Sequence, residues 1–278
     1  MAIRTVFRTL LRSMFFSLCV VAIIGGLCAI DALYVEPNFP RLIRQEVFIQ
    51  GLPESLDGLK VVHLSDLHIV RFGKREARAL KLVARIEPDL VCLTGDYIGD
   101  DGITPGDHTD EYCMRQAARF MSGLHAKYGL YAVSGNWDPL ADKREFERAG
   151  VRRIDGESLT LEMRGARLRL ASFGAIQKQM ENKSTKRSRH IPTILLEHFP
   201  EVADNFAVAD SPVDLVLAGH WHGGQVGWPL KMTDVKYLAG LYRVGRVQLY
   251  VSRGLGMHSR AVRFNCPSEV GLIVLRCR

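Results

Sequence analysis

Cysteine is scarce in this chain, and its six cysteines do not form a disulfide framework. Two of them fall in an apolar N-terminal run and a third, Cys92, lies in a segment typical of a buried strand. Only Cys113, Cys266 and Cys277 therefore remain for pairing. A Cys266–Cys277 disulfide and free thiols both stay open, so cysteine usage does not decide the compartment.

Internal repeats are also absent, and the length fits one large domain. After the first roughly 35 residues, about 240 remain, which is enough for a single α/β domain with a substantial core. We therefore divide the chain into residues 1–35, a basic segment followed by an apolar helix, and residues 36–278, one globular domain.

The run Met14–Ile30 contains no charged residue. It is near the lower length limit for crossing a bilayer, and Ala32–Val35 can extend it. Arg4, Arg8 and Arg12 precede it, which places the N-terminus in the cytoplasm and the domain outside. A cleaved signal peptide is the alternative, but no clean Ala-x-Ala site follows. We expect an uncleaved, single-pass anchor in the cell membrane.

Metal-binding residue types follow four apolar runs that are typical of buried strands. Asp66 follows one run, Asp96 the next, and Asn136 and His220 follow two more; the runs are Val61–Leu64, Leu90–Leu93, Tyr131–Val133 and Leu215–Ala218. Ligands bind at the carboxyl ends of strands in open α/β sheets, because the loops converge there. The pattern predicts one site.

The residue types of this predicted site narrow its chemistry. Carboxylates and imidazoles without thiolates favour Mn, Fe, Zn or Mg over a structural zinc–cysteine site. Asp66 and His68 can reach one ion through a tight turn, and Asp96 has two oxygens with which to bridge two ions. Glycine precedes three of the predicted ligands, where the missing Cβ permits a close approach of the backbone.

Five segments in order carry a resemblance to a known family. They are Ser65–His68, Gly95–Tyr97, Gly135–Asp138, Glu197–His198 and Gly219–Gly224. This order resembles that of the calcineurin-like metallophosphoesterases. Similarity to their membrane-anchored bacterial branch, which is similar to the UDP-2,3-diacylglucosamine hydrolase-type phosphodiesterases, runs from about Leu59 to the C-terminus and includes Val251–Gly256.

The resemblance implies an α/β fold, a four-layer αββα sandwich, here preceded by one transmembrane helix. It also implies two divalent ions, one held by Asp66, His68, Asp96 and His222 and the other by Asp96, Asn136, His198 and His220. The catalytic group would comprise Asp96, Asn136, Trp137 and Asp138.

Trp137 departs from the family pattern, which usually has histidine after the asparagine. An indole donates a hydrogen bond but cannot transfer a proton near neutral pH. The UDP-2,3-diacylglucosamine hydrolases resemble this chain in lacking that histidine, which they replace with arginine. We expect activity that favours good leaving groups, because activation of water by the metals is the larger contribution.

Basic residues crowd the stretch from Lys178 to His190. The stretch could be a solvated loop, or a flap beside the metals that binds phosphates or anionic lipid headgroups. On the second interpretation Arg187 and His190 contact substrate, together with Trp137 and Trp221. No aromatic residues interleave the charges, so nucleic acid is not an expected partner.

The remaining patterns predict the order of elements. We expect strands at Val47–Ile49, Lys60–Leu64, Asp89–Leu93 and Gly129–Val133, helices at Lys74–Ile86, Glu111–Ala126 and Pro139–Ala149, and a hairpin of Ser158–Met163 with Arg167–Phe173.

A membrane-anchored phosphoesterase acting on a phosphorylated amphiphile or nucleotide-linked lipid is the favoured function. The alternatives are a phosphodiesterase of soluble nucleotides or generic diesters, and a catalytically impaired metal-containing binding protein.

Overall fold

The computed structural model describes residues 2–99, 109–138, 143–181, 191–208, 210–227, 229–230, 233–259 and 262–277. The α-helices are α1 (Ala2–Ile30), α2 (Glu36–Asn38), α3 (Lys74–Ile86), α4 (Asp110–Met121), α5 (Lys143–Arg148) and α6 (Phe173–Glu181). A π-helical turn η1 (Asp31–Val35) joins α1 to α2, and three 3₁₀ helices are η2 (Glu54–Leu56), η3 (Pro200–Phe206) and η4 (His222–Gly224).

Twelve strands form two six-stranded sheets in the described residues. They are β1 (Arg41–Ile49), β2 (Lys60–Leu64), β3 (Leu90–Thr94), β4 (Leu130–Val133), β5 (Val151–Arg153), β6 (Ser158–Met163), β7 (Ala166–Ser172), β8 (Thr193–Leu196), β9 (Leu215–Ala218), β10 (Gly240–Val244), β11 (Val247–Val251) and β12 (Glu269–Cys277). The first sheet has the order β1-β12-β2-β3-β4-β5 and the second β10-β11-β9-β8-β7-β6.

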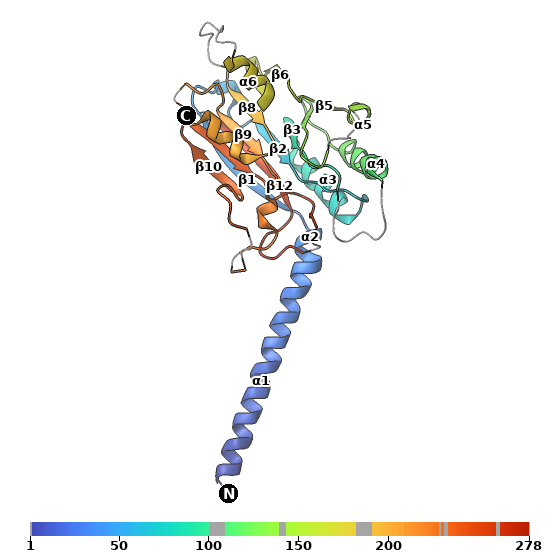
Figure 1. Cartoon of the computed structure of the whole chain (residues 1–278), viewed down its shortest axis with the longest axis vertical. Helices are drawn as coiled ribbons and strands as arrows, with labels where there is room; N and C mark the ends of the chain where they lie inside the picture. Colours follow the sequence, from blue (N-terminus) through green and yellow to red (C-terminus); the bar gives the residue numbers. More distant parts are fainter. Residues whose placement is uncertain are drawn as a thin grey trace.

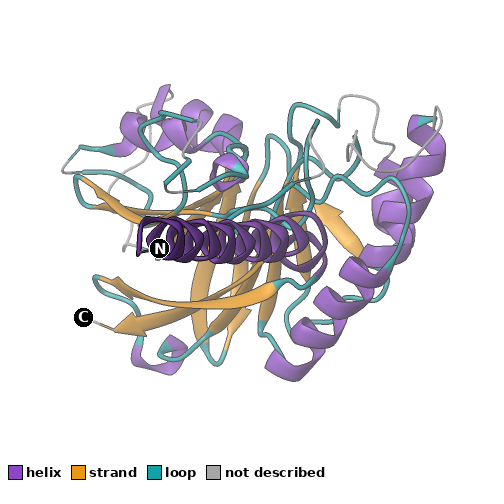
Figure 2. Cartoon of the chain, turned by 90° about the horizontal axis from the view of Figure 1, so that it is seen from below, coloured by secondary structure: helices purple, strands orange, loops and turns teal. Residues whose placement is uncertain are grey.

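Side chains on the two faces of each strand pack against the neighbouring layers. In β2, Val62 and Leu64 pack against α3 and α4, whereas Val61 faces the second sheet. Successive residues of a strand point to opposite faces, so a strand buried on both faces is apolar throughout. The outer face of the second sheet is covered by Ile176 of α6 and Phe206 of η3. Figure 2 shows helices on both outer sides of the sheets, which confirms the four-layer αββα sandwich.

The predicted elements are present, with differences in extent; strand β1, for example, begins at Arg41 instead of Val47. Helix α4 ends at Met121 instead of continuing to Ala126, because Gly123 follows and the N–H groups of Gly123 and Leu124 bond to Phe120 and Met121 in a tightened turn. The hairpin of β6 and β7 turns at Arg164 and Gly165, which have φ values of 51° and 75°. Both central residues of this two-residue turn are left-handed, as a type I′ turn requires.

Other elements are not among the predicted ones. Strand β12 lies between β1 and β2, parallel to β1 and antiparallel to β2. Helix α6 includes Lys178, so this part of the basic stretch is helical and not a loop. Arg187 and His190, together with the start of the helix predicted from Pro139, lie outside the described residues.

The N-terminal helix leaves the domain at one end and projects away from it (Figure 1). The segment Phe7–Asn38 has the length and composition of a membrane-spanning helix, and the domain buries none of its most apolar window. Its C-terminal end differs, because Ala32, Glu36 and Pro37 are buried against the domain. The domain boundary predicted between residues 35 and 36 therefore falls inside a segment that packs against the domain both before and after that boundary.

Candidate metal centre

Loops at the ends of five strands carry the predicted ligands. Asp66 and His68 follow β2, Asp96 follows β3, and Asn136 follows β4, all in the first sheet. His198 follows β8, and His220 and His222 follow β9, both in the second sheet. The site therefore lies where the edges of the two sheets meet, as the carboxyl ends of the strands predict.

The first cluster consists of Asp66, His68, Asp96 and His222, all buried. Nε2 of His68 lies 3.1 Å from Nε2 of His222, and 3.6 Å from Oδ2 of Asp96. Nε2 of His222 lies 3.5 Å from Oδ1 of Asp66. Two carboxylates and two imidazoles thus point their ligand atoms at one point.

The second cluster consists of Asp96, His198 and His220, with Asn136 beside it. Nδ1 of His220 lies 3.2 Å from Nε2 of His198 and 3.1 Å from Oδ1 of Asn136. Nε2 of His198 lies 3.2 Å from Oδ2 of Asp96. Because Oδ2 of Asp96 faces both His68 and His198, this one oxygen joins the two clusters.

These distances fit a divalent ion at each cluster. Two ligand atoms that each lie about 2.1 Å from one ion are about 3.0–3.4 Å apart when the ligand–metal–ligand angle is between a right angle and the tetrahedral angle. The close nitrogen pairs of both clusters have this spacing. Nδ1 of His198 is 2.7 Å from the Thr94 carbonyl and donates to it, which orients Nε2 toward Asp96 and the second cluster.

Burial sets the protonation of the first cluster. It lowers the pKa of His68 to about 3 and that of His222 well below its usual value, so both imidazoles are neutral and offer lone pairs. It also raises the pKa of the Asp66 carboxyl to about 6. At His198 burial is outweighed by the hydrogen bond to Asp96 and the charge of Asp66, which raise its pKa to about 9.

Backbone conformation at the site is unusual. Five of the seven predicted ligands have positive φ: Asp66 at 51°, His68 at 39°, Asp96 at 55°, His220 at 77° and His222 at 51°. A non-glycine residue in the left-handed region costs about 1–3 kcal/mol and persists only where its surroundings fix it. The ligand loops are therefore strained, as is typical of binding sites.

Glycine permits the close approach of these loops. A Cβ on Gly219 would overlap Oγ of Ser65 and Oδ2 of Asp66, and one on Gly135 would overlap Oδ1 of Asp96. Any larger residue at either position would push a ligand carboxylate out of place.

Asp138 is hydrogen-bonded to the backbone of two ligand loops. Its Oδ2 accepts hydrogen bonds from the N–H groups of Asp96 at 2.7 Å and Gly135 at 2.8 Å, and Oδ1 accepts from Tyr97 at 2.8 Å. The carboxylate thus holds the loops after β3 and β4 together. The catalytic role that the sequence predicts for Asp138 stays a prediction, and these contacts also suit a positioning residue.

We expect Asp138→Ala to leave three N–H groups without their partner, and each of the two buried ones, those of Asp96 and Tyr97, costs about 1–3 kcal/mol. The melting temperature and the metal content should fall, and turnover should drop about 10- to 100-fold, the usual effect of removing a group that orients ligands. Thermal unfolding and metal analysis test this. Loss of turnover with unchanged stability and metal content would instead support the catalytic role.

A pocket of about 460 Å³ opens over the clusters. Trp137 and Trp221 line it, and His258 lies beside the metal ligands His68 and His222. The ring of His258 is centred 4.8 Å from that of Trp137 and 5.3 Å from that of His68. The Trp221 indole donates to Oε1 of Glu201 at 2.8 Å, so its orientation is fixed. Sequence patterns favour a structural or solvated role for His258, and its only local signal is the adjacent Val251–Gly256 segment.

The calcineurin-like phosphoesterase family model matches residues 59–224, which is more than half of the chain. The matched segment contains all seven residues predicted to bind metal. It ends before His258 and before β12, so these parts of the site are outside the matched region.

Relatives of similar length match most of the chain. A metallophosphoesterase of Bacillus subtilis, YkuE, is 29% identical over 97% of each chain. The phosphodiesterase YaeI of Escherichia coli is 26% identical over 87% of this chain and 90% of its own. The UDP-2,3-diacylglucosamine pyrophosphatase LpxG of Chlamydia trachomatis is 25% identical over 88% of this chain and 92% of its own.

The family uses a binuclear metal centre, and both clusters described above could hold its ions. The chain therefore belongs to the calcineurin-like phosphoesterases and is a metal-dependent hydrolase of phosphoester bonds.

Proposed function

We propose that this protein is anchored in the membrane and hydrolyses a phosphodiester or pyrophosphate bond in a phosphorylated lipid or a nucleotide-linked lipid, such as UDP-2,3-diacylglucosamine. The observation that supports the proposal is the position of the clusters. They lie at the end of the domain from which the apolar helix departs.

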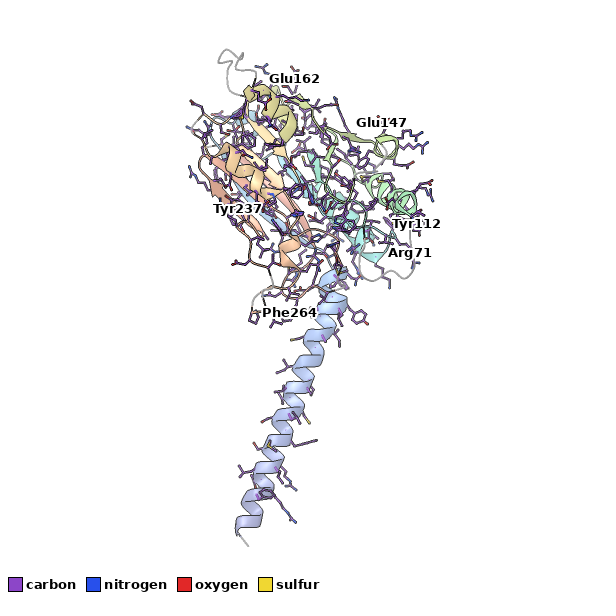
Figure 3. The ribbon with its side chains drawn as sticks, in the orientation of Figure 1. Arg71, Tyr112, Glu147, Glu162, Tyr237 and Phe264 are labelled. Atoms are coloured by element: carbon purple, nitrogen blue, oxygen red, sulfur yellow. The ribbon has the colours of Figure 1, made fainter. Side chains whose placement is uncertain are left out.

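Strand register supports this placement. Arg41, which begins β1 just after α2, pairs with Glu269 of β12, and Gly271 of β12 pairs with His63 of β2. The carboxyl end of β2, where Asp66 follows, is therefore only two strands from the end of the helix. Figure 3 labels Phe264 beside the helix end, whereas Glu162 of the β6–β7 hairpin lies at the opposite end. The N–H of Phe264 bonds to Gln225, which lines the pocket.

A helix that spans the bilayer would hold the pocket close to the membrane surface. A lipid-linked phosphate would then reach the clusters without leaving its bilayer. The match to a relative named for UDP-2,3-diacylglucosamine supports this substrate class. The arginines before the apolar run favour a domain on the extracytoplasmic side of the cell inner membrane.

Ions at the two clusters would act as Lewis acids and lower the pKa of water. The protein's part is to position the reacting groups. Oδ2 of Asp96 fixes the separation of the clusters, and Asn136 and His220 form the edge that faces the pocket. Trp137 and Trp221 form one wall of the substrate pocket and exclude water from that side of the substrate.

Removal of the helix tests the substrate class. The shortened chain should begin at Asp31, because the turn that follows packs on the domain. We expect it to be soluble and to hydrolyse a water-soluble nitrophenyl phosphodiester at the rate of the full chain. Its rate on a lipid-linked substrate in vesicles should fall by about 100-fold, since the tether supplies effective concentration.

Three results would point elsewhere. Equal rates on vesicles with and without the helix would favour a soluble nucleotide or generic diester as substrate. Metal-loaded protein that cleaves neither substrate would favour a binding protein. A shortened chain that loses activity on the soluble diester would show that the helix matters to the site itself.

A further inference from the structure

The turn that joins the N-terminal helix to β1, residues 31–38, is packed into the domain. Leu33, Tyr34 and Val35 are exposed, whereas Ala32, Glu36 and Pro37 are buried. The buried side faces the segment Arg263–Ser268, which runs beside the pocket on its way to β12. We call residues 31–38 the juxtamembrane turn. One face of this turn packs against the domain.

The π-helical register of this turn leaves a carbonyl without a helical donor. The N–H of Glu36 bonds to the carbonyl of Asp31, five residues earlier. In the same register the carbonyl of Ala32 would pair with residue 37, which is proline and has no N–H. The N–H of Arg263 takes this position, at 3.0 Å from the Ala32 oxygen.

The side chain of Arg263 extends from the juxtamembrane turn toward the first cluster. Its side chain is fully buried, and the guanidinium donates to the carbonyls of Cys266 at 3.0 Å, Arg253 at 2.8 Å and Gly254 at 3.1 Å, and also to that of Gly256. One planar fork thus holds the loop of residues 253–256 in place.

That loop fixes the backbone of Asp66. The N–H of Gly256 bonds to the Asp66 carbonyl at 2.7 Å, and the N–H of Leu255 bonds to that of Ser65 at 3.0 Å. A Cβ on Gly254 would come within 2.8 Å of Cβ of Asp66, so the contact is tight. Asp66 has a left-handed backbone and depends on such contacts to keep it.

Cys266 connects the same turn to His222. Its N–H donates to Oε2 of Glu36 at 2.8 Å, and its thiol lies 3.3 Å from the carbonyl of His222 and 3.4 Å from that of Gly223. Glu36 thus reaches a second ligand of the first cluster through one residue. His222 also has a left-handed backbone.

We propose that the juxtamembrane turn positions the first metal cluster: Glu36 and Ala32 hold Arg263 and Cys266, which in turn hold Asp66 and His222. The second cluster shares one contact with the first, because the N–H of His220 donates to the Asp66 carboxylate at 2.9 Å, and is otherwise held by different groups. His198 is held by the Thr94 carbonyl, and the loop of Asn136 is held by Asp138. The turn should therefore weaken the binding of the first ion more than that of the second.

Stepwise Co²⁺ binding to the full chain in detergent micelles, followed by visible absorption, tests this inference and does not depend on the substrate. His68→Ala identifies the step that belongs to the first cluster, and His198→Ala the step of the second. We expect Glu36→Ala to weaken the first-cluster step by about tenfold, the low end of the effect of removing a supporting group. Glu36→Gln keeps an acceptor for Cys266 and should restore most of the affinity.

Asp57→Ala is the matched control. Oδ1 of Asp57 accepts from the N–H of Cys277 at 2.9 Å, which is the same type of contact near the other end of β12. Because Asp57 is exposed whereas Glu36 is buried, this variant should lower the melting temperature less than Glu36→Ala does, and both Co²⁺ steps should keep their affinity.

Arg263→Lys provides a second, independent variant. Lysine keeps the charge but cannot donate to four carbonyls at once, so the first-cluster step should again weaken about tenfold. Folded Glu36→Ala and Arg263→Lys proteins with unchanged Co²⁺ binding would overturn the proposal. Equal weakening by Asp57→Ala, or equal weakening of both steps, would overturn it as well. So would failure of both turn variants to fold while Asp57→Ala folds, since the turn would then serve folding alone.

Discussion

Asp96→Asn should abolish hydrolysis and lower metal occupancy at both clusters. Oδ2 of Asp96 lies 3.6 Å from Nε2 of His68 and 3.2 Å from Nε2 of His198, so it is the group within reach of both ions. Asparagine has the same shape and can still accept the N–H of Trp137, which bonds to Oδ1 at 2.9 Å. It loses the negative charge between the ions, and we expect turnover to fall by about 1,000-fold or more.

His68→Ala and His198→Ala serve as controls for this prediction, because each removes a ligand from one cluster. Metal analysis of the purified variants should show one ion lost in each of them and a loss at both clusters in Asp96→Asn. Full activity of Asp96→Asn after metal stripping would exclude a two-metal mechanism. Loss of one ion only would show that Asp96 serves a single cluster.

Trp137→His should raise turnover on substrates with poor leaving groups. The wild-type indole cannot transfer a proton, so the rate should depend steeply on the pKa of the leaving group. Substrates whose leaving group is nitrophenolate or a phosphate ester should be cleaved much faster than substrates whose leaving group is an alkoxide. Histidine at this position would supply a donor and raise turnover on alkoxide leaving groups by up to about 100-fold. The Trp137 backbone contact to Asp96 does not depend on the side chain, so metal content should stay unchanged.

Trp221→His is the matched control, because its indole lines the same pocket but is held by Glu201. It should give no gain on poor leaving groups. Trp137→Ala should raise KM if the indole walls the substrate. A wild-type rate independent of leaving group, with no gain from Trp137→His, would mean that another residue donates the proton. His258, centred 4.8 Å from the Trp137 ring, would be the first to replace, ahead of His190.

Periodicity and motif order in the sequence determined the strands that carry the ligands. Residues Lys60–Leu64 are apolar enough to be buried on both faces, and such a strand can only lie inside a sheet. Asp66, Asp96, Asn136 and His220 follow four such strands, so their convergence was predictable without coordinates. The apolar run before residue 31 was equally clear, because its hydrophobicity and flanking charges are local properties.

Tertiary structure alone decided how the ligands are held. The insertion of β12 between β1 and β2 depends on pairing across more than 200 residues, for which no local pattern exists. That strand brings Arg263 and Cys266 to Asp66 and His222, and it brings the end of the N-terminal helix to the same place. The side chain of Asp138 points toward backbone N–H groups, and that of His258 points into the pocket. Both orientations likewise follow from packing between loops. A sequence motif specifies which atoms can bind a metal, whereas their orientation depends on distant backbone groups that only the folded chain brings together.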